Sequence, residues 1–280
     1  MRQVREMEII QIDITNACDG PACSNCTRML KHHKKPYQMD FDTFKRAVES
    51  LRMYPGVVGL FGGNPCLHKD FRKFVEHFIE ARPDKKLRGL WSNGMGQHSD
   101  LYDTFGCHVY NTHTQQCYHQ PTMIAIQDVV DESVMWGLID QCSVNLRWSA
   151  CVTPKGVYFC EIAAAWDMVY DEDHALPITD GWWEKDLSEF ECQKRRWCPN
   201  CSMALPLPAR LDKEAVDDVS ARHLPVCNPS RKVEVFDVES YELAKNKTGW
   251  SPLEYKDTDL RKKNILRPRT KVIRMKRKSK

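Results

Sequence analysis

Three short apolar stretches near the start of the chain alternate with two segments of helical period. Each stretch is rich in β-branched or aromatic residues, which predicts a strand; the expected strands are residues 8–14, 57–63 and 87–91. Residues 41–54 and 70–82 carry apolar side chains three or four positions apart, which predicts two amphipathic helices. Asp40 is the expected N-cap of the first helix, and Pro83 lies just past the second. This alternation indicates an α/β fold with a mostly parallel sheet.

The pattern changes after about residue 135. Helical periodicity weakens, aromatic residues and prolines become more frequent, and cysteines recur. We therefore expect three parts along the chain. They are a core over residues 1–135, a smaller cysteine-rich unit with further C-terminal segments over residues 136–260, and a tail over residues 261–280.

Charge separates the tail from the rest of the chain. The tail carries 11 Lys or Arg and no acid, whereas the other 260 residues hold 30 basic and 38 acidic side chains. A block of like charge is usually disordered and often contacts a polyanion. The tail is therefore expected to be disordered, and either to bind nucleic acid, DNA in particular, or to be only a solvated end.

The apolar runs and the cysteine count suggest a compartment. No run of about 18 apolar residues is present, which argues against a transmembrane helix. The first ten residues lack the apolar segment of a signal peptide. We expect a cytoplasmic protein (in the host cytoplasm if it is viral) with no membrane partner. In that reducing compartment its 13 cysteines are expected to be metal ligands, buried thiols or catalytic groups, and not disulfides.

The densest chemistry lies directly after the first expected strand. Cys18, Cys23 and Cys26 occur within nine residues, with no fourth cysteine beside them. A structural zinc site takes four ligands, usually in two pairs, and a disulfide framework needs an even number of cysteines. Three clustered thiolates indicate an iron–sulfur cluster in which one iron stays open for a non-protein ligand. The alternative is a zinc knuckle with His32 or His33 as the fourth ligand.

Two polar turns follow the second and third expected strands. The first contains Gly62, Gly63 and Asn64, and the second contains Ser92 and Asn93. In parallel α/β sheets, ligands bind at the carboxyl ends of strands, where the cysteine loop also lies. Glycine allows a backbone to approach a ligand closely. The sequence therefore predicts one shared site at this edge of the sheet.

This combination resembles the radical S-adenosylmethionine (SAM) superfamily. The resemblance covers roughly residues 8–130 and rests on the three cysteines after the first strand and on "GGNP" (62–65) after the second. It implies a partial (β/α)6 barrel in which three thiolates hold a [4Fe–4S] cluster and SAM chelates the fourth iron. An electron from a low-potential donor would then cleave SAM, and the 5′-deoxyadenosyl radical would abstract hydrogen from a substrate carbon.

The sequence departs from the superfamily's pattern at two places. The usual spacing is Cys-x3-Cys-x2-Cys, whereas this chain has one more residue in the first gap. Asn64 stands where the "GGE" turn of the superfamily has glutamate, and an amide accepts a hydrogen bond without bringing a negative charge. The resemblance implies that Gly62, Gly63 and Asn64 receive the methionine amino group of SAM, and that Ser92 and Asn93 form a second SAM-contacting turn.

A second set of four cysteines lies in the C-terminal unit: Cys142, Cys160, Cys198 and Cys201. Four thiolates on a loop-rich segment hold either a structural zinc ion or an iron–sulfur cluster. The turn at residues 153–156 and the following "GVYFC" resemble the hairpin of the twitch or SPASM appendage of radical SAM enzymes. That resemblance implies one auxiliary [4Fe–4S] cluster.

Other conspicuous residues lie outside the two cysteine sets. Cys151 and Cys192 are spare ligand candidates. The isolated cysteines are expected to be small buried or neutral residues; they are Cys66, Cys107, Cys117 and Cys227. Residues 113–121 (HTQQCYHQP) gather polar and aromatic groups where a substrate pocket is expected, although His113 and His119 are assigned no catalytic role. Trp182 and Trp183 are expected to pack in the core.

The leading functional hypothesis is a radical SAM enzyme. The basic tail leads to its most specific form, an isomerase of viral DNA hypermodification that converts an N-linked glycyl thymidine to the C-linked form. Because a scaffold does not fix the reaction, two alternatives stay open. One is dehydrogenation or modification of a small sugar-like molecule or a peptide. The other is a non-enzymatic nucleic-acid-binding protein with structural metal sites.

Overall fold

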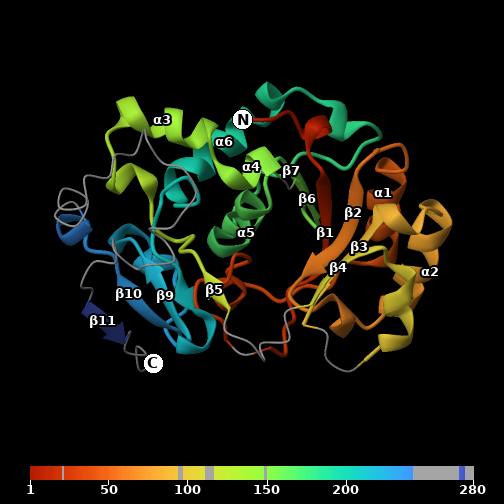
Figure 1. The fold of residues 1–280 in the computed structure, drawn as a ribbon, viewed down its shortest axis with the longest axis horizontal. Coiled ribbons are helices and arrows are strands. Elements are labelled where there is room, and N and C mark those ends of the chain that lie inside the picture. The colour runs from red at the N-terminus through yellow and green to blue at the C-terminus, as the bar shows by residue number, and fades with distance from the viewer. Residues whose placement is uncertain (21, 94–96, 111–116, 148–149, 242–270, 275–280) are drawn as a thin grey trace.

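Strand β1 (Ile9–Thr15) lies in the middle of the main sheet. The computed structural model describes residues 1–280 except 21, 94–96, 111–116, 148–149, 242–270 and 275–280. The main sheet has six strands in the order β4-β3-β2-β1-β6-β7. Its other strands are β2 (Val57–Gly62), β3 (Arg88–Ser92), β4 (Cys107–Tyr110), β6 (Ala150–Thr153) and β7 (Gly156–Tyr158). All neighbours pair in parallel except β6 and β7, which are antiparallel. The protein is therefore a mixed α/β fold built on a parallel sheet (Figure 1).

Helices cover this sheet and connect its strands. The α-helices of the described residues are α1 (Phe41–Ser50), α2 (Phe71–Ala81), α3 (Glu132–Asp140), α4 (Ser143–Arg147), α5 (Glu161–Tyr170) and α6 (Glu191–Trp197). Helices α1 and α2 lie beside β2, β3 and β4, at the right of Figure 1, whereas α5 lies near the centre of the view. Strand β1 sends Ile10 and Ile12 into the main core and Asp13 to the opposite face. Phe44 of α1 and Phe74 of α2 belong to the same core and stack with ring centroids 4.1 Å apart.

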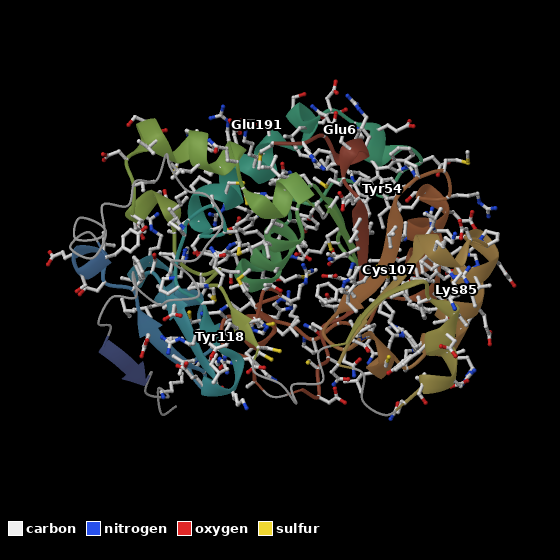
Figure 2. The ribbon with its side chains drawn as sticks, viewed as in Figure 1. Glu6, Tyr54, Lys85, Cys107, Tyr118 and Glu191 are labelled. Carbon is white, nitrogen blue, oxygen red and sulfur yellow. The ribbon has the colours of Figure 1, made fainter. Side chains whose placement is uncertain are left out.

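The elements expected in the first 92 residues are confirmed. The three strands begin and end within one residue of their expected bounds. Asp40 caps α1, because its carboxylate accepts the N–H of Thr43 at 2.8 Å. The first helix ends at Ser50, four residues earlier than expected. Tyr54, labelled in Figure 2, is buried beyond it and donates a hydrogen bond to the carbonyl of Met7 at 2.5 Å.

The main sheet continues past residue 135, where we expected the core to end. Strand β6 pairs in parallel with β1, with Ile10 opposite Ala150 and Ile12 opposite Val152. The hairpin expected around residues 153–156 is present, with Thr153 opposite Gly156. Because β1 is central, it has a second edge that needs a partner, and the fully buried strand β6 supplies it. The cysteine-rich unit is thus joined to the core through the sheet.

Two smaller sheets complete the described structure. Strands β5 (Tyr118–His119) and β8 (Arg210–Leu211) pair antiparallel. Strand β10 (Lys232–Val235) pairs in parallel with β9 (Val216–Val219) and antiparallel with β11 (Lys271–Arg274). Within the tail that we expected to be disordered, residues 271–274 therefore form a strand. Figure 1 shows this three-stranded sheet on the opposite side of the view from α1 and α2.

No helix among the described residues is both long enough and apolar enough to cross a membrane.

Candidate functional site

The turn after β2 packs directly against the loop that leaves β1. The N–H groups of Gly63 and Asn64 donate to the carbonyls of Thr15 and Ala17 at 2.8 and 2.7 Å. A Cβ at Gly62 would lie 2.1 Å from the oxygen of Thr15, and one at Gly63 would lie 2.0 Å from that of Ala17. Gly62 also has a φ of +125°, which side chains rarely adopt. The close approach that these glycines allow is therefore made by the protein's own backbone.

Polar side chains from three strand ends meet in one hydrogen-bonded group. The amide nitrogen of Asn64 donates to the carboxylate of Asp19 and to the side-chain oxygen of Asn93, each at 3.0 Å. Asn93 donates to the same Asp19 oxygen at 2.6 Å. Asn64 and Asn93 are buried, whereas Asp19, which follows Cys18, is exposed. The structure thus brings the cysteine loop and both polar turns together at the carboxyl edge of the sheet.

Ser92 belongs to a second small group beside this one. Its hydroxyl and that of Tyr102 are hydrogen-bonded to the thiol of Cys66, with 3.7 Å between the Cys66 sulfur and the Tyr102 oxygen. Burial raises the pKa of Cys66, and these hydrogen bonds only partly oppose it. Cys66 is therefore a buried neutral thiol, as we expected of an isolated cysteine. Ser92 is thus hydrogen-bonded to Cys66, which lies two residues after Asn64.

Cys18, Cys23 and Cys26 all lie in the loop after β1 and are partly exposed. Burial raises the pKa of Cys23 to about 12, and the adjacent thiols of Cys26 and Cys18 contribute to that rise. Burial also raises the pKa of Cys26, although the N–H groups of Leu30 and Arg28 hydrogen-bond to its sulfur and lower it. A bound cation reverses this balance, because a thiol that coordinates a metal is deprotonated. The raised pKa values of Cys23 and Cys26 are of the kind that a bound, positively charged metal group would offset.

The thiols fit an iron–sulfur cluster by donor type and by position in one loop. They do not display its coordination geometry, since no three His, Cys, Asp or Glu side chains in the described ranges are arranged to hold a metal ion. N–H groups that point at a sulfur, as at Cys26, are a usual feature of cluster-binding thiolates.

The two histidines considered as a fourth zinc ligand have other partners. His32 contacts the Asp217 carboxylate through Nε2 at 2.9 Å and accepts the N–H of Asn228 at Nδ1. His33 contacts the carbonyl of Arg28 through Nε2 at 2.8 Å and the side chain of Asn16 through Nδ1. Burial and the Arg28 charge lower the pKa of His33 to about 3. The described contacts therefore give no support to a zinc knuckle.

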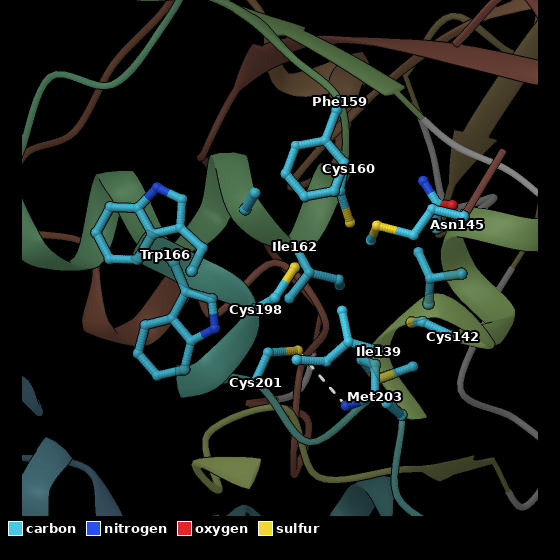
Figure 3. A pocket seen from close by; sticks show the side chains of 15 residues that line it. Ile139, Cys142, Asn145, Phe159, Cys160, Ile162, Trp166, Cys198, Cys201 and Met203 are labelled. Carbon is cyan, nitrogen blue, oxygen red and sulfur yellow. Dashed lines mark hydrogen bonds between the residues drawn. The ribbon is translucent and has the colours of Figure 1, made fainter. Parts of the chain in front are cut away.

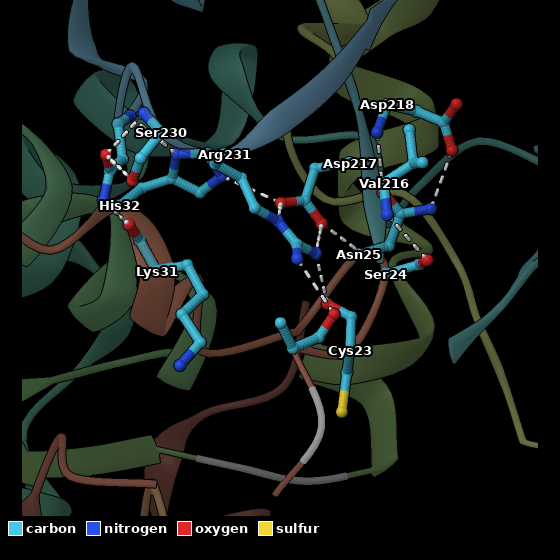
Figure 4. Close-up of polar contacts among 12 residues, drawn as sticks. Cys23, Ser24, Asn25, Lys31, His32, Val216, Asp217, Asp218, Ser230 and Arg231 are labelled. Carbon is cyan, nitrogen blue, oxygen red and sulfur yellow. Dashed lines mark hydrogen bonds and ion pairs between the residues drawn. The ribbon is translucent and has the colours of Figure 1, made fainter. Parts of the chain in front are cut away.

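The cysteine loop is held by a C-terminal segment that sequence patterns did not reveal. Arg231 forms two hydrogen bonds with the Asp217 carboxylate and also donates to the carbonyls of Ala22 and Cys23 (Figure 4). We call residues 210–235 the clamp segment. The sequence signal for this segment is the pair of consecutive acids, Asp217 and Asp218, between the two valines of β9, because buried carboxylates require partners. That signal does not say which partners they have.

Arg28 connects the first cysteine loop with the second cysteine set. Its buried guanidinium forms an ion pair with Asp13 of β1 and lies 5.4 Å from the Phe61 ring centroid. It also donates to the carbonyl of Glu161 at 2.6 Å, and Glu161 directly follows Cys160. Because Arg28 lies two residues after Cys26, one side chain joins the backbones of both thiol sets.

The second set of cysteines lines one cavity. Cys142, Cys160, Cys198 and Cys201 come from α3's end, the start of α5 and the end of α6, and Figure 3 shows their sulfurs around the same space. Burial raises the pKa of Cys160 to about 12, with a contribution from Cys142. Burial likewise raises the pKa of Cys198 and Cys201, and each is raised further by other members of the set. The structure thus brings together all four residues expected to form a second site.

Backbone N–H groups also point at two sulfurs of this set. Those of Ile162 and Ala163, in the first turn of α5, hydrogen-bond to Cys160, and the N–H of Met203 lies 3.5 Å from the sulfur of Cys201. A helix N-terminus and such N–H groups favour a thiolate over a thiol. These surroundings fit thiolate ligands by donor type, although in the described ranges no three His, Cys, Asp or Glu side chains, this set included, are arranged to hold a metal ion.

The spare cysteines do not join this cavity. Cys151 is buried against the Arg28 guanidinium, with 3.6 Å between the sulfur and the donor nitrogen, and Cys192 is exposed on α6. Cys227 is buried, and Cys107 and Cys117 are partly exposed. Cys227 thus has the buried position expected of it, whereas Cys107 and Cys117 are not buried.

The remaining expectations concern aromatic and polar residues. Trp182 and Trp183 are buried and donate to Ser50 at 3.2 Å, so they pack in the core as expected. Residues 113–116 lie outside the described part of the chain. His119 of the same stretch contacts the carbonyl of Ser24 at 2.8 Å, which places it against the first cysteine loop. Most of the tail, residues 261–270 and 275–280, also lies outside the described residues.

The chain was compared with protein-family models, curated proteins and solved structures. No protein-family model matches the sequence, and no curated protein matches it. Among solved structures, BtrN in complex with AdoMet and 2-DOIA matches with a TM-score of 0.46 at 19% identity, over 70% of this chain and 92% of that one. BtrN in an open conformation gives 0.38 at 18%, over 69% and 86% of the two chains. SuiB of Streptococcus suis bound to S-adenosylmethionine gives 0.29 at 15%, over 35% and 22%. Similarities of this size establish neither family nor activity.

Proposed function

We propose that the protein is a radical SAM enzyme whose [4Fe–4S] cluster is held by Cys18, Cys23 and Cys26. The observation that carries this proposal is the position of the three thiols. They lie in the loop after β1, and that loop is hydrogen-bonded through Asp19 to the polar turns after β2 and β3. Three thiolates leave one iron of such a cluster for a non-protein ligand. The proposal includes a partial (β/α)6 barrel and action in the cytoplasm with a low-potential electron donor.

In this proposal the polar turns after β2 and β3 form the SAM site, and their residues have separate roles. Gly62 and Gly63 let the β2 turn dock on the cysteine loop, while Asn64 and Asn93 fix both turns to Asp19. Ser92 lies beside them on the buried end of β3. When bound, the cluster and SAM would supply one-electron cleavage of SAM and hydrogen abstraction from a substrate carbon. The protein would orient the substrate and exclude water.

The test is anaerobic reconstitution with iron and sulfide, followed by dithionite and SAM. We expect 5′-deoxyadenosine from the wild type and none from Cys18→Ala, Cys23→Ala or Cys26→Ala, because each variant removes one ligand from a site that has only three. Cys192→Ala, which removes an exposed thiol on α6, is the matched control and should behave as the wild type. A protein that binds nucleic acid but never cleaves SAM would instead be a binding protein with structural metal sites.

We propose further that Cys142, Cys160, Cys198 and Cys201 hold an auxiliary [4Fe–4S] cluster of a twitch or SPASM-like appendage. Two such clusters correspond to about eight irons per chain, whereas a structural zinc site would give about four irons and one zinc. Metal analysis of the reconstituted protein separates these outcomes. Replacing Cys198 and Cys201 by alanine should remove about four irons, leave some SAM cleavage and strongly reduce product. Full product from a folded double variant would show that the second site is dispensable.

The substrate is proposed from charge. The 11 basic residues of the tail suit a substrate carried on nucleic acid, because phosphate contacts give affinity without reading sequence. Our most specific proposal is therefore isomerisation of N-linked glycyl thymidine to the C-linked form in viral DNA. Deleting the gene should then change the modified base in that DNA. An unchanged base composition would favour the other substrate classes, a small sugar-like molecule or a peptide.

A further inference from the structure

We infer that the clamp segment positions the Cys23–Cys26 turn for metal binding, with Arg231, Asp217 and Asn25 as positioning residues. This inference rests on the proposed function only for the identity of the metal group. The contacts between the clamp segment and the turn are independent of that function. The clamp segment lies about 190 residues after the turn along the chain, and its contacts reach the turn's main chain.

Arg231 and Asp217 bind the two ends of the turn. Arg231 donates to the carbonyls of Ala22 and Cys23 at 2.9 and 2.6 Å, so it fixes the peptide planes on both sides of Cys23. The Asp217 carboxylate accepts the N–H of Asn25 at 2.6 Å, one residue before Cys26. The two side chains also bind each other in two-pronged geometry, at 2.5 and 3.0 Å. Figure 4 shows this arrangement around the labelled Cys23.

Asn25 completes the contact in an unusual backbone conformation. Its φ is +49°, in the left-handed region that asparagine tolerates better than most residues. The side-chain amide donates to the Asp218 carboxylate at 2.8 Å and accepts the Asp218 N–H at 2.8 Å. The hydroxyl of the preceding Ser24 accepts the N–H of Val216 at 3.1 Å. The residues between Cys23 and Cys26 are therefore bonded to β9 by side chain and main chain alike.

The chemistry of the clamp segment suits a metal site whose backbone must be ordered before the metal binds. Arg231 and Asp217 are more than nine-tenths buried, and a buried ion pair is retained only where its geometry is fixed. An ion pair serving stability alone would not need to bind the carbonyls of Ala22 and Cys23. By holding both peptide planes, the clamp fixes the direction in which the Cys23 side chain leaves the backbone. A second guanidinium, Arg210, holds Asp218 in turn.

The first test uses the protein without metal, so it is independent of SAM chemistry. Cys23 and Cys26 are labelled with iodoacetamide, and the labelling rate is followed by peptide mass spectrometry. In Arg231→Met we expect both thiols to be labelled faster by a factor on the order of ten. This factor corresponds to a decrease of about 1.4 kcal/mol in the activation free energy of labelling. Arg231→Lys keeps the positive charge but loses the two-pronged guanidinium. Its labelling rates should therefore lie between those of Arg231→Met and the wild type.

A matched control comes from the same segment. Arg222 forms a two-pronged ion pair with Asp128 that is partly exposed and does not contact the cysteine loop. Arg222→Met should leave the labelling of Cys23 and Cys26 unchanged. A second variant, Asn25→Gly, keeps the left-handed backbone without strain and removes only the amide contacts with Asp218. It should therefore fold and still accelerate labelling, which covers the case in which Arg231→Met does not fold.

The second readout follows reconstitution with iron and sulfide. We expect Asn25→Gly and Arg231→Lys to broaden the electron paramagnetic resonance spectrum of the reduced first cluster and to shift its potential, while Arg222→Met does neither. Wild-type labelling rates and an unchanged spectrum in Asn25→Gly would overturn the inference. A wild type that takes up no iron would overturn the proposed function. Accelerated labelling in the variants would then still support the clamp as the element that orders the turn.

Discussion

Gly62 and Gly63 are required by the backbone of the neighbouring loop. The carbonyl oxygens of Thr15 and Ala17 lie only 2.1 and 2.0 Å from the positions where Cβ atoms on Gly62 and Gly63 would be. The same approach lets the N–H groups of Gly63 and Asn64 bond to those carbonyls. At this scale, two residues without side chains are what allow the end of β2 to meet the cysteine loop.

Gly62→Ala should therefore destabilise the protein by at least about 2 kcal/mol, because it combines a positive φ with a backbone clash. Gly137→Ala is the matched control. Gly137 lies in α3 with no atom within 4 Å of an added Cβ, so alanine should stabilise the protein by about 0.5 to 1 kcal/mol. Urea unfolding of the metal-free protein measures both changes. Equal midpoints for the two variants would contradict this account of Gly62.

Individual site residues could be predicted where they are close in sequence. Cys18, Cys23 and Cys26 were identifiable because they share one loop, and Asn64 and Asn93 because each follows a strand. Arg231 and Asp217 were not identifiable, because their partners at Ala22, Cys23 and Asn25 are 192 to 209 residues away. A buried arginine or aspartate signals that a partner exists but does not name it.

At the scale of elements, one arginine connects two helices and a strand. Arg82, the residue after α2, donates to the carbonyls of Leu51, Tyr54 and Gly56 at 2.6, 3.0 and 2.7 Å. The first two carbonyls lie at and after the end of α1, and the third precedes β2. The Arg82 side chain is buried, and so are its hydrogen bonds to Leu51 and Tyr54, so loss of the guanidinium would leave buried carbonyls without a donor. Arg82 thus fixes where α1 ends and β2 begins.

Arg82→Met should lower the free energy of unfolding by about 3 kcal/mol, because several buried carbonyls lose a charged donor. Arg72→Met is the control from the same helix. Arg72 is half exposed and pairs with Asp100 on the surface, so its loss should change the unfolding midpoint little. Chemical denaturation of both variants gives the comparison. The proposed role of Arg82 fails if the two substitutions have the same effect.

Elements were predictable from local pattern, but their assembly was not. The strands at residues 8–14, 57–63 and 87–91 and the hairpin turn at residues 153–156 are present within a residue or so of the expected bounds. The place of that hairpin beside β1 could not be seen, because strand order is set by contacts between distant segments. The clamp segment likewise contains only short strands, whose pairing carries no local signature.

At the scale of the whole molecule, the contacts of Arg28 link the two thiol sets. Its guanidinium joins β1, the first cysteine loop and the residue after Cys160. The clamp segment holds the same loop, and strand β11 of the basic tail pairs with β10 at the end of that segment. The tail is therefore tied, through one sheet, to the element that orders the first thiol site.

Deleting residues 261–280 tests what the tail contributes to binding. The deletion removes 11 positive charges, and each phosphate contact contributes roughly 0.7 to 0.9 to the slope of log affinity against log salt. The intact protein should bind duplex DNA with a steep salt dependence and little sequence preference, and the truncated protein should bind weakly. SAM cleavage without substrate should survive, because the proposed ligands of both metal groups lie outside the tail.

A second variant separates charge from the strand. Replacing Lys276, Arg277, Lys278 and Lys280 by glutamine removes four charges and leaves residues 271–274, and hence β11, unchanged. If the tail binds phosphates, this variant should keep wild-type stability, and the slope of log affinity against log salt should fall by up to about 3.6, in proportion to the charges removed. Equal affinity and slope in all three proteins would mean that the tail does not contact DNA. The nucleic-acid substrate would then lose its main support, and a small sugar-like molecule or a peptide would become the better candidate.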